Sequence, residues 1–303
     1  MASISVLILT KNEAHDIAGC LASVAALSTD VHVLDSGSTD DTCAIAASLG
    51  ATVTVRAFDN FAAQRNFGLH DLPYRNDWVL MLDADERIGA ALIEEFHALV
   101  AGCDADVAAA RMGRRDFWLG THLRHATISP FNIRLVRRSR VHFEREINEV
   151  LVVDGAVAEL RHPFDHYPFS KGMVHWLNKH NLYSTMEAEL IAQRKAGKPD
   201  IGKAFFARDP NERRMHQKRL FYRAPARPLI KFLYMFIWRR SFLDGVAGLH
   251  YTMLQCIYEY MIVLKTREQL ERMSEEAGTG ASAAKPSVPL AGAAVKSKAP
   301  GQA

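Results

Sequence analysis

Short apolar segments alternate with segments of helical spacing through the first 100 residues, and this alternation most constrains the fold. The apolar segments are largely uninterrupted by polar side chains, which predicts strands buried on both faces. We place these strands at Ile4–Thr10, Val31–Asp35, Ala51–Arg56 and Trp78–Leu82. The helical segments are expected at 14–26, 40–49, 60–69 and 90–100. Strands alternating with helices predict a doubly wound, Rossmann-like α/β fold with a mostly parallel sheet.

After about residue 104 the pattern changes. Strand-like segments joined by polar loops indicate a mixed sheet, and they lie at Val107–Arg111, Ile133–Val136 and Val150–Val157. From about Ser170 the chain becomes helical, and from Ser274 it has too few large apolar side chains to fold. We therefore divide the chain into a nucleotide-binding half at 1–105, an acceptor-binding half at 106–170, a helical region at 171–273 and a disordered tail at 274–303.

The composition is that of an ordinary globular chain. The 303 residues are 49% hydrophobic and 23% charged, which excludes collagenous, fully disordered and disulfide-scaffold proteins. The four cysteines form no C-x-x-C pair, so a zinc or disulfide framework is disfavoured. The first apolar stretch, Ile4–Leu9, is too short for the core of a signal peptide, and we expect the protein to stay in the cytoplasm.

The strand at 78–82 runs directly into two carboxylates, Asp83 and Asp85. Residues two positions apart on extended backbone point to the same side, so these two converge. Ligands of doubly wound sheets bind beyond the carboxyl ends of the strands, where two carboxylates resist joint ionisation unless a cation compensates them. A divalent metal that bridges to a diphosphate is one explanation. A strand that ends in a solvated polar turn is the other.

Polar residues also follow the other strands of this half. Asp35 is followed by a small-residue turn, 36–40, where a carboxylate can accept hydrogen bonds from a base or a ribose. The Ser and Asp side chains of this turn are equally suited to helix capping. Thr10–Glu13 follows the first strand, and Gln64–Asn66 lies on the helix before Asp83. Because all of them face one crevice, we interpret them together as a ligand site.

These motifs resemble family 2 glycosyltransferases, which have the GT-A nucleotide-sugar-binding fold. The resemblance rests on the segments Leu9–Glu13, Asp35–Asp40, Gln64–Asn66 and Leu82–Glu86. More narrowly, the chain resembles bacterial lipopolysaccharide core β-glucosyltransferases from about Ser3 to Glu268. The resemblance implies a mixed, mostly parallel GT-A sheet with a C-terminal helical, membrane-associating extension.

On the donor side, the resemblance implies a UDP-sugar and a divalent cation, Mg²⁺ or Mn²⁺. It assigns nucleotide-sugar binding to Thr10, Asn12, Glu13, Asp35, Arg65 and Asp83. Asp85 is the implied metal ligand. His166, in a segment that resembles the family's His-Tyr element, is implied as a further metal ligand. Related enzymes commonly have an acidic residue where this chain has Ser36.

On the acceptor side, Asn132–Arg138 resembles a strand of the family written RLFRR, which assigns Arg134 and Arg137 to acceptor binding. Inverting enzymes of this type need a carboxylate that takes the proton of the acceptor hydroxyl. The resemblance implies Glu149 for this role, with Glu146 in reserve, because relatives commonly have Val-His-Glu where this chain has Ile-Asn-Glu at 147–149. Without the resemblance, both glutamates are interpreted as exposed loop charges.

A basic, aromatic segment lies between residues 203 and 240, where eleven Lys and Arg residues accompany only two acidic ones. Such a mixture fits a nucleic-acid site, a core helix with snorkelling cations, or a helix at a membrane interface. A transmembrane span is disfavoured, because the apolar run Phe232–Trp238 is too short. Ser241–Gly248 resembles an element of membrane-associated relatives, which favours the interface and disfavours a nucleic-acid partner.

The sequence therefore predicts an inverting, metal-dependent glycosyltransferase. We expect it to move a hexose, glucose in the first instance, from a UDP-sugar to a glycolipid such as a lipopolysaccharide core intermediate. Its expected place is peripheral, on the cytoplasmic face of the inner membrane. Two other classes stay open: a non-catalytic relative that binds nucleotide or membrane within an assembly, and a phosphotransferase or phosphatase that uses Asp83 as a nucleophile.

Overall fold

The computed structural model describes residues 4–127, 131–144, 149–193, 197–207 and 210–282. These residues form two compact units. One contains the described residues up to Asn181 together with Pro228–Glu259. The other contains the described residues of Leu182–Arg227 and those from Tyr260 onward.

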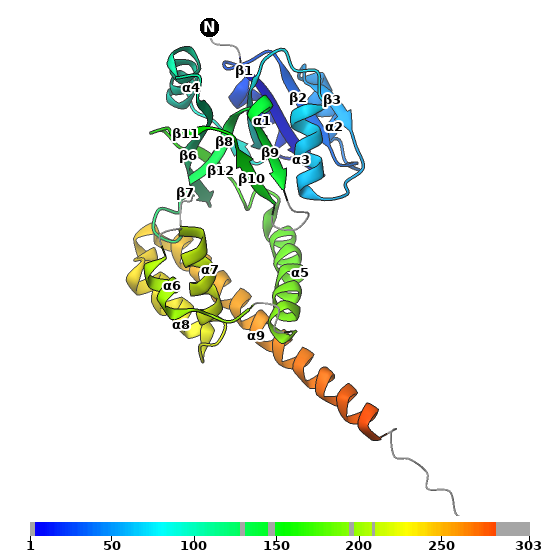
Figure 1. The fold of residues 1–303 in the computed structure, drawn as a ribbon, viewed down its shortest axis with the longest axis vertical. Coiled ribbons are helices and arrows are strands. Elements are labelled where there is room, and N and C mark those ends of the chain that lie inside the picture. Colours follow the sequence, from blue (N-terminus) through cyan, green and yellow to red (C-terminus); the bar gives the residue numbers. More distant parts are fainter. Residues whose placement is uncertain (1–3, 128–130, 145–148, 194–196, 208–209, 283–303) are drawn as a thin grey trace, which may run out of the picture. The chain divides into compact units, whose positions relative to one another are not determined.

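A mixed β-sheet is the centre of the first unit (Figure 1). The strands of this unit are β1 (Ile4–Thr10), β2 (Val31–Asp35), β3 (Thr52–Val55), β4 (Trp78–Asp83), β5 (Glu86–Arg87), β6 (Val107–Trp118), β7 (Thr121–His122), β8 (Phe131–Arg137), β9 (Val141–Glu144), β10 (Val150–Val153), β11 (Ala156–Glu159) and β12 (Phe164–His166). The sheet has the order β3-β2-β1-β4-β8-β6-β12-β5, and β7 and β11 pair with β6 outside this path. β9 and β10 form a separate antiparallel ribbon.

The register of the parallel strands brings three strand ends to one edge of the sheet. β3, β2, β1 and β4 run parallel to one another. Thr10 lies beside Asp35, and Leu9 lies beside Asp83. The polar residues that follow β1, β2 and β4 therefore share this edge, as the sequence predicts. β8 runs antiparallel to both β4 and β6, which makes the sheet mixed.

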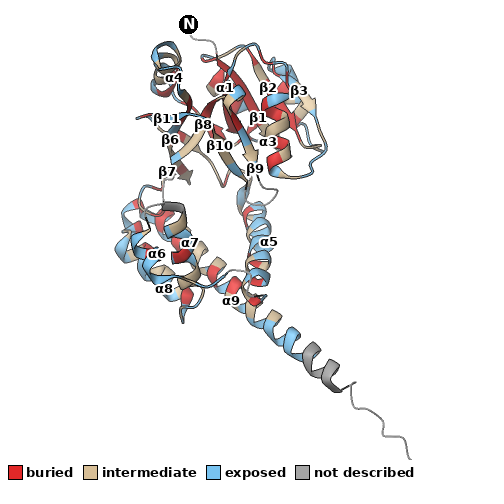
Figure 2. Ribbon diagram, viewed as in Figure 1, coloured by how far each residue is buried: buried red, intermediate tan, exposed pale blue. Residues whose placement is uncertain are grey.

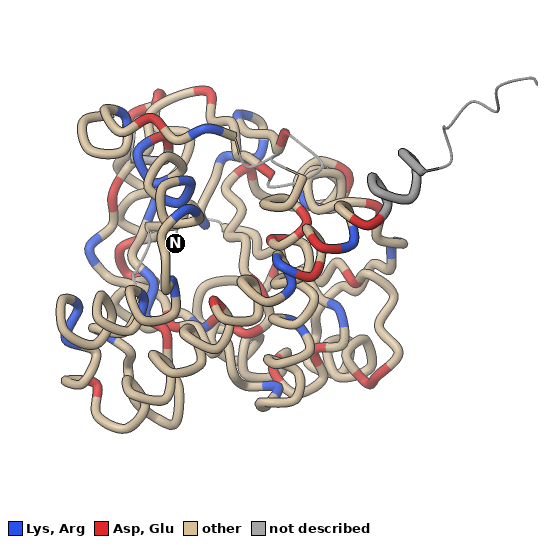
Figure 3. The backbone as a smooth tube through the Cα atoms, turned by 90° about the horizontal axis from the view of Figure 1, so that it is seen from below, with Lys and Arg blue, Asp and Glu red and all other residues tan. Residues whose placement is uncertain are grey.

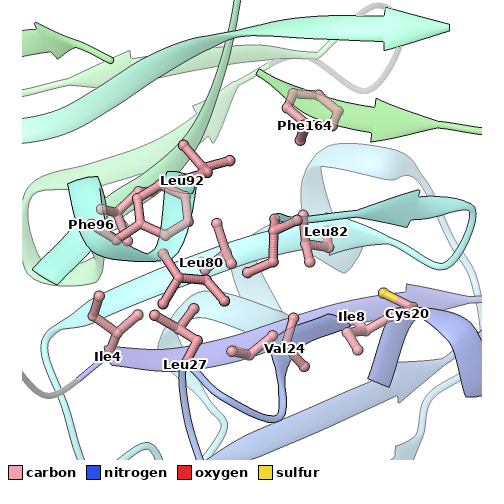
Figure 4. Close-up of a cluster of buried hydrophobic side chains, with 14 of the residues drawn as sticks. Ile4, Ile8, Cys20, Val24, Leu27, Leu80, Leu82, Leu92, Phe96 and Phe164 are labelled. Atoms are coloured by element: carbon pink, nitrogen blue, oxygen red, sulfur yellow. The ribbon is translucent and has the colours of Figure 1, made fainter. Parts of the chain in front are cut away.

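Helices cover the parallel strands on both faces, because these strands are apolar on both sides. The helices of this part are α1 (Ile17–Val24), α2 (Thr42–Ser48), α3 (Phe61–His70) and α4 (Ala90–Gly102). One hydrophobic cluster joins β1 and β4 to α1 and α4, and it includes Ile8, Leu80 and Phe96 (Figure 4). A second cluster on the opposite face joins Leu7 of β1 to Leu69 of α3. The predicted strands and helices of the first 100 residues are confirmed, with ends shifted by a few residues.

The strand predicted over 150–157 is wrong, because the chain turns at Gly155 and forms the two strands β10 and β11. Gly155 has a φ of 140°, and a Cβ atom there would lie 2.4 Å from the carbonyl oxygen of Asp106. No side chain fits at this turn. β10 pairs with β9, whereas β11 pairs with β6.

The C-terminal part of the chain is helical. Its elements are the helices α5 (Gly172–Ala192), α6 (Ile201–Phe206), α7 (Pro210–Phe221), α8 (Arg227–Leu233) and α9 (Gly245–Ser282), and the short π-helical and 3₁₀ turns η2 (Tyr234–Trp238) and η3 (Ser241–Asp244). The 3₁₀ turn η1 (Arg138–Arg140) lies earlier, between β8 and β9. The basic segment predicted at 203–240 is thus divided among several elements and between the two units.

Within the second unit, polar contacts join its helices. Asp200 caps α6 by accepting the backbone N–H of Lys203 at 3.0 Å, and its own N–H donates to Nδ1 of His216 on α7 at 3.0 Å. Lys218 of α7 pairs with Glu187 of α5 at 2.7 Å, and Tyr222 donates to the same carboxylate.

The helix α9 extends to Ser282, past residue 274, where the sequence predicts a tail. Residues 270–275 of this helix are exposed (Figure 2), and this part of it carries both acidic and basic residues (Figure 3), such as the Glu268–Arg272 pair one turn apart. Such pairs support a helix that has little core contact. None of the helices in the described residues is long and apolar enough to cross a membrane.

Candidate active site

The carboxylate of Asp35 organises the loop that follows β2. Its Oδ1 accepts the backbone N–H groups of Gly37 and Ser38 at 2.9 and 2.6 Å, and its Oδ2 accepts the hydroxyls of Thr10 and Ser38 at 2.7 and 2.5 Å. Burial alone would raise the pKa of Asp35, but these hydrogen bonds outweigh it and lower the pKa. Asp35 and Thr10 are therefore brought together as predicted, in a buried cluster that fixes both loops.

A series of hydrogen bonds joins the loop after β1 to the loop after β2. Asn12 adopts a φ of 53°, donates its backbone N–H to the Ser38 hydroxyl at 2.7 Å and accepts the N–H of Thr39 at 2.8 Å. The side chain of Lys11 donates to the carbonyl oxygens of Ser36 and Gly37. The backbone N–H of Glu13 donates to the Thr42 hydroxyl at 2.7 Å. The two loops therefore form one rigid wall of the site.

Glu13 is held at the end of this wall by Lys171, whose ammonium lies 2.5 Å from Oε1. Burial raises the pKa of Glu13 to about 7, although the lysine acts in the opposite direction. The other carboxyl oxygen, Oε2, is buried and has no hydrogen-bond partner among the described residues. A ligand that binds beside this wall can donate a hydrogen bond to this oxygen.

Asp83 lies between two arginines. Its Oδ2 accepts Nη2 of Arg134 at 2.8 Å, and its Oδ1 lies 3.6 Å from Nη2 of Arg65. Arg134 also pairs with the buried Glu86, which in turn accepts the backbone N–H of Asp83 at 3.0 Å. Desolvation opposes ionisation of Asp83, but Arg134 and Arg65 outweigh it and lower the pKa. Asp83 is therefore a fixed anion at neutral pH.

Arg65 connects Asp83 to the predicted base. Its Nε lies 3.5 Å from Oε1 of Glu149, and its guanidinium lies 5.5 Å from the ring centroid of Phe143. The Nε atom is buried and makes no hydrogen bond within the described residues. Arg65 thus places a cation, with capacity for a further partner, between two carboxylates.

Asp85 faces His166. Oδ2 of Asp85 lies 3.4 Å from Nε2 of His166, while Nδ1 of His166 lies 2.6 Å from Oδ1 of the buried Asp116. Burial alone would lower the pKa of His166, but its hydrogen bonds to Asp116 and Asp85 raise the pKa to about 9. The imidazolium is therefore held between two carboxylates.

The Asp85–His166 pair fits a divalent cation. Carboxylate oxygen and imidazole nitrogen are suitable donors, and two neighbouring ligands of one small cation lie about 3 Å apart. A bound cation would replace the proton on Nε2 of His166. No group of three or more His, Cys, Asp or Glu side chains is arranged for a metal within the described residues. Mg²⁺ usually keeps several waters and binds through one or two carboxylates together with substrate phosphates.

Comparison with known proteins identifies the family of the chain. Residues 5–164, more than half of the chain, match the model of the family described as Glycosyl transferase family 2. The chain is a family 2 glycosyltransferase. Its mixed, mostly parallel sheet with strand-end acidic residues is the GT-A fold expected from the sequence.

Three relatives and one solved structure illustrate the similarity. An uncharacterized glycosyltransferase of Rickettsia felis is 28% identical, over 89% of this chain and 91% of the relative. Uncharacterized glycosyltransferase RT0209 of Rickettsia typhi is 32% identical over 64% of this chain and 70% of the relative. The lipopolysaccharide core biosynthesis glycosyltransferase LpsC of Rhizobium meliloti is 25% identical over 86% of this chain and 91% of the relative. The crystal structure of glucosyl-3-phosphoglycerate synthase from Mycobacterium tuberculosis is 23% identical with a TM-score of 0.32, and the match covers 37% of this chain and 44% of that one.

One predicted residue of this glycosyltransferase, Arg137, is not brought to the site. Arg137 lies beside Trp78, at the amino end of β4, with its guanidinium 4.8 Å from the Trp78 ring and its Nε donating to the carbonyl of Val107 at 2.9 Å. It therefore packs at the opposite end of the strand from Asp83. Glu146 lies outside the described residues. Arg134 is at the site, but its guanidinium is engaged by Asp83 and Glu86 rather than turned toward an acceptor.

Sequence reasoning missed three side chains that shape the site. Glu86 was visible directly after the acidic pair, whereas Asp116 and Lys171 are isolated charged residues in the sequence. Asp116 orients His166 and Lys171 holds Glu13, and both contacts span more than 45 residues of chain. No local sequence pattern predicts such partners.

Proposed function

We propose that this family 2 glycosyltransferase transfers a hexose from a UDP-sugar to a glycolipid acceptor, with inversion at the anomeric carbon and with the help of Mg²⁺ or Mn²⁺. The observation that carries this proposal is the position of Arg65 between Asp83 and Glu149, beside the Asp85–His166 pair. In this arrangement Arg65 supplies a cation for a diphosphate, the Asp85–His166 pair supplies donors for a metal, and Glu149 supplies a carboxylate that can accept a proton.

The donor occupies the crevice between the loop wall and the acidic pair. Two buried atoms have no hydrogen-bond partner among the described residues: Oε2 of Glu13 and Nε of Arg65. We expect polar groups of the donor to form hydrogen bonds with these two atoms. Buried polar atoms of this kind are costly until a partner arrives. The wall made by the loops after β1 and β2 is fixed in advance, so the donor meets an ordered surface.

The residues of this chain then perform a single displacement. Glu149 takes the proton of the acceptor hydroxyl while that oxygen attacks the anomeric carbon from the face opposite the diphosphate. Arg65 orients Glu149 and offsets negative charge on the departing diphosphate. A divalent cation held by Asp85 and His166 would neutralise further charge on that leaving group. The two arginines beside Asp83, at 2.8 and 3.6 Å, favour an electrostatic role for this carboxylate in holding the donor.

The acceptor class follows from similarity and from an exposed surface. LpsC, similar along most of the chain, is named for lipopolysaccharide core biosynthesis. Residues 229–246 expose large apolar side chains: Leu229, Leu233, Ile237, Trp238, Phe242, Leu243 and Val246. Trp238 is 79% exposed, and Arg240 beside it is exposed as well. Aromatic side chains flanked by cations fit the headgroup region of an anionic bilayer, where a glycolipid acceptor resides.

Calorimetric titration of the purified protein with UDP tests the donor site. We expect binding that requires Mn²⁺ and is weaker by at least about tenfold for GDP, which is a difference of about 1.4 kcal/mol. If a folded sample binds neither nucleotide, the transferase proposal fails. Sedimentation with anionic vesicles tests the surface: Trp238→Ser is expected to reduce binding, and Phe58→Ser, another exposed aromatic position, is the matched control.

A further inference from the structure

A cavity of about 430 Å³ opens beside the Asp85–His166 pair, in the first unit. His15 lines it from the loop after β1, and Arg87 lines it from β5. Phe117 and Trp118 contribute from the end of β6, and Tyr167 and Phe169 from the segment after β12. Its volume lies within the range of about 300–1,000 Å³ that is typical of small-molecule sites.

Two stacked pairs of aromatic rings form one part of the cavity wall. The ring centroids of Phe117 and Tyr167 are 5.5 Å apart, and those of Trp118 and Phe169 are 4.2 Å apart, with both pairs nearly parallel. The guanidinium of Arg87 lies 5.7 Å from the centroid of Tyr167. Flat apolar faces with polar groups at the margin suit a ligand that is itself apolar on one face and polar at its edges.

Hydrogen bonds connect the residues that line the cavity to the Asp85–His166 pair and its neighbours. The N–H of Tyr167, the residue after His166, donates to the carbonyl oxygen of Asp85 at 2.9 Å. Arg87 donates to the carbonyl of Ala84 at 2.6 Å. Phe117 follows Asp116, whose carboxylate holds His166. A ligand in the cavity therefore lies close to the Asp85–His166 pair, against residues that follow β1, β6 and β12.

We propose that this cavity binds a pyranose ring of the acceptor, an assignment that rests on the proposed function. A pyranose presents C–H bonds on its faces and hydroxyls around its edge, which matches aromatic walls with charged groups at the rim. The nucleotide is received elsewhere, at the Thr10–Asp35 wall. The cavity thus provides the specificity for the acceptor sugar.

The same cavity is tied to the exposed apolar surface at 229–246. Oδ2 of Asp244 accepts the backbone N–H groups of His125 and Ala126 at 2.8 and 2.7 Å. Arg239 donates to the carbonyl oxygens of His125 and Thr127 at 3.1 and 2.5 Å. These residues follow the cavity-lining turn of β6 and β7 by only a few positions. An acceptor whose sugar lies in the cavity and whose lipid stays in a bilayer satisfies both surfaces, which favours a glycolipid over a free sugar.

Two variants of the full chain test the cavity from opposite directions. Phe117→Leu removes one ring of a stacked pair, and His15→Trp fills the cavity from an exposed position. Phe206→Leu and His70→Trp are matched controls at exposed positions elsewhere. The probes are UDP-glucose with Mn²⁺ as donor and, as acceptor, the soluble core oligosaccharide released from lipopolysaccharide by mild acid. Circular dichroism and thermal unfolding establish that each variant is folded.

We expect both cavity variants to raise the KM for the oligosaccharide about tenfold, with the affinity for UDP in the presence of Mn²⁺ within about twofold of wild type. If Phe117→Leu does not fold, His15→Trp alone gives the result. An unchanged acceptor KM, an equal loss of UDP affinity, or failure of the UDP-loaded wild-type protein to bind the oligosaccharide overturns the cavity assignment. Absence of UDP binding in the wild type overturns the proposed function instead, which separates the two failures.

Discussion

Asp35 and Asp85 each follow or end a buried parallel strand at the same edge of the sheet, yet their surroundings differ completely. Asp35 is fully buried and accepts four hydrogen bonds from its own chain. Asp85 is 27% exposed and faces one imidazole at 3.4 Å. A carboxylate that is saturated internally shapes a loop, whereas one with open coordination capacity is able to receive a ligand.

The contrast extends to the charges around each residue. Neutral hydroxyls and backbone N–H groups surround Asp35, and their hydrogen bonds stabilise its negative charge. Arg65, Arg134 and His166 surround the acidic pair. Residues at the ends of neighbouring strands thus form a preformed wall and a reactive centre, and we expect a change in one to leave the other intact.

Replacing Asp85 with Asn is expected to have the largest effect. The amide keeps the shape but removes the anionic metal donor, so kcat should fall by about 10³-fold, as several kcal/mol of charge stabilisation are lost. Initial rates with UDP-glucose measure this change, and the melting temperature should stay within about 2 °C. Activity near the wild-type level would remove Asp85 from the chemistry.

Glu149→Gln is expected to have the next largest effect, a fall in kcat of about 10²-fold, because general-base catalysis contributes about 10² to 10⁴. The affinity for UDP should be unchanged, since the side chain faces the acceptor hydroxyl in the proposed reaction. Rate and calorimetry on the same preparation separate the two quantities. Glu144→Gln, a nearby exposed glutamate, is the matched control. A loss of UDP binding together with the rate would assign Glu149 to the donor instead.

Asp35→Asn is expected to act on stability first. An amide cannot accept all four hydrogen bonds, so the free energy of unfolding should fall by about 2 kcal/mol, measured by urea denaturation at pH 7. Burial raises the pKa of Asp35 but the hydrogen bonds lower it below the unfolded value of about 3.9. Its stabilisation is therefore complete above that value and is lost as the pH falls through the folded pKa. The variant should accordingly lose less stability than the wild type between pH 5 and pH 2.

The sequence could predict this division only in part. Apolar strands followed by polar residues located the edge, because strand ends in a parallel sheet coincide. The strand pattern of 131–137 could not predict that Arg134 pairs with Asp83 while Arg137 lies at the other end. That outcome depends on the antiparallel register of β8 against β4, which sets Leu135 beside Leu80. Register arises from pairing between distant segments, and local spacing does not contain it.

The turn at Gly155 shows the same limit for the fold. The run from 150 to 157 has the composition of one strand, and only the close approach of the Asp106 carbonyl explains why the chain reverses there. Lys171 and Asp116 have no local signal, because each acts through a partner more than 45 residues away. Sequence thus predicts which residue types reach the edge better than it predicts their partners.

Ser38→Ala is expected to have the smallest effect and sharpens the contrast most directly. The change removes one of the four hydrogen bonds to Asp35 and the bond from Asn12 N–H, while the backbone N–H of residue 38 still reaches Oδ1. We expect a loss of about 1 kcal/mol in stability and a fewfold weaker UDP affinity, with kcat at saturating donor unchanged. Ser48→Ala, at the end of α2, is the control. A fall in kcat with intact UDP affinity would show that the wall takes part in the chemical step, and the separation of the two regions would then be wrong.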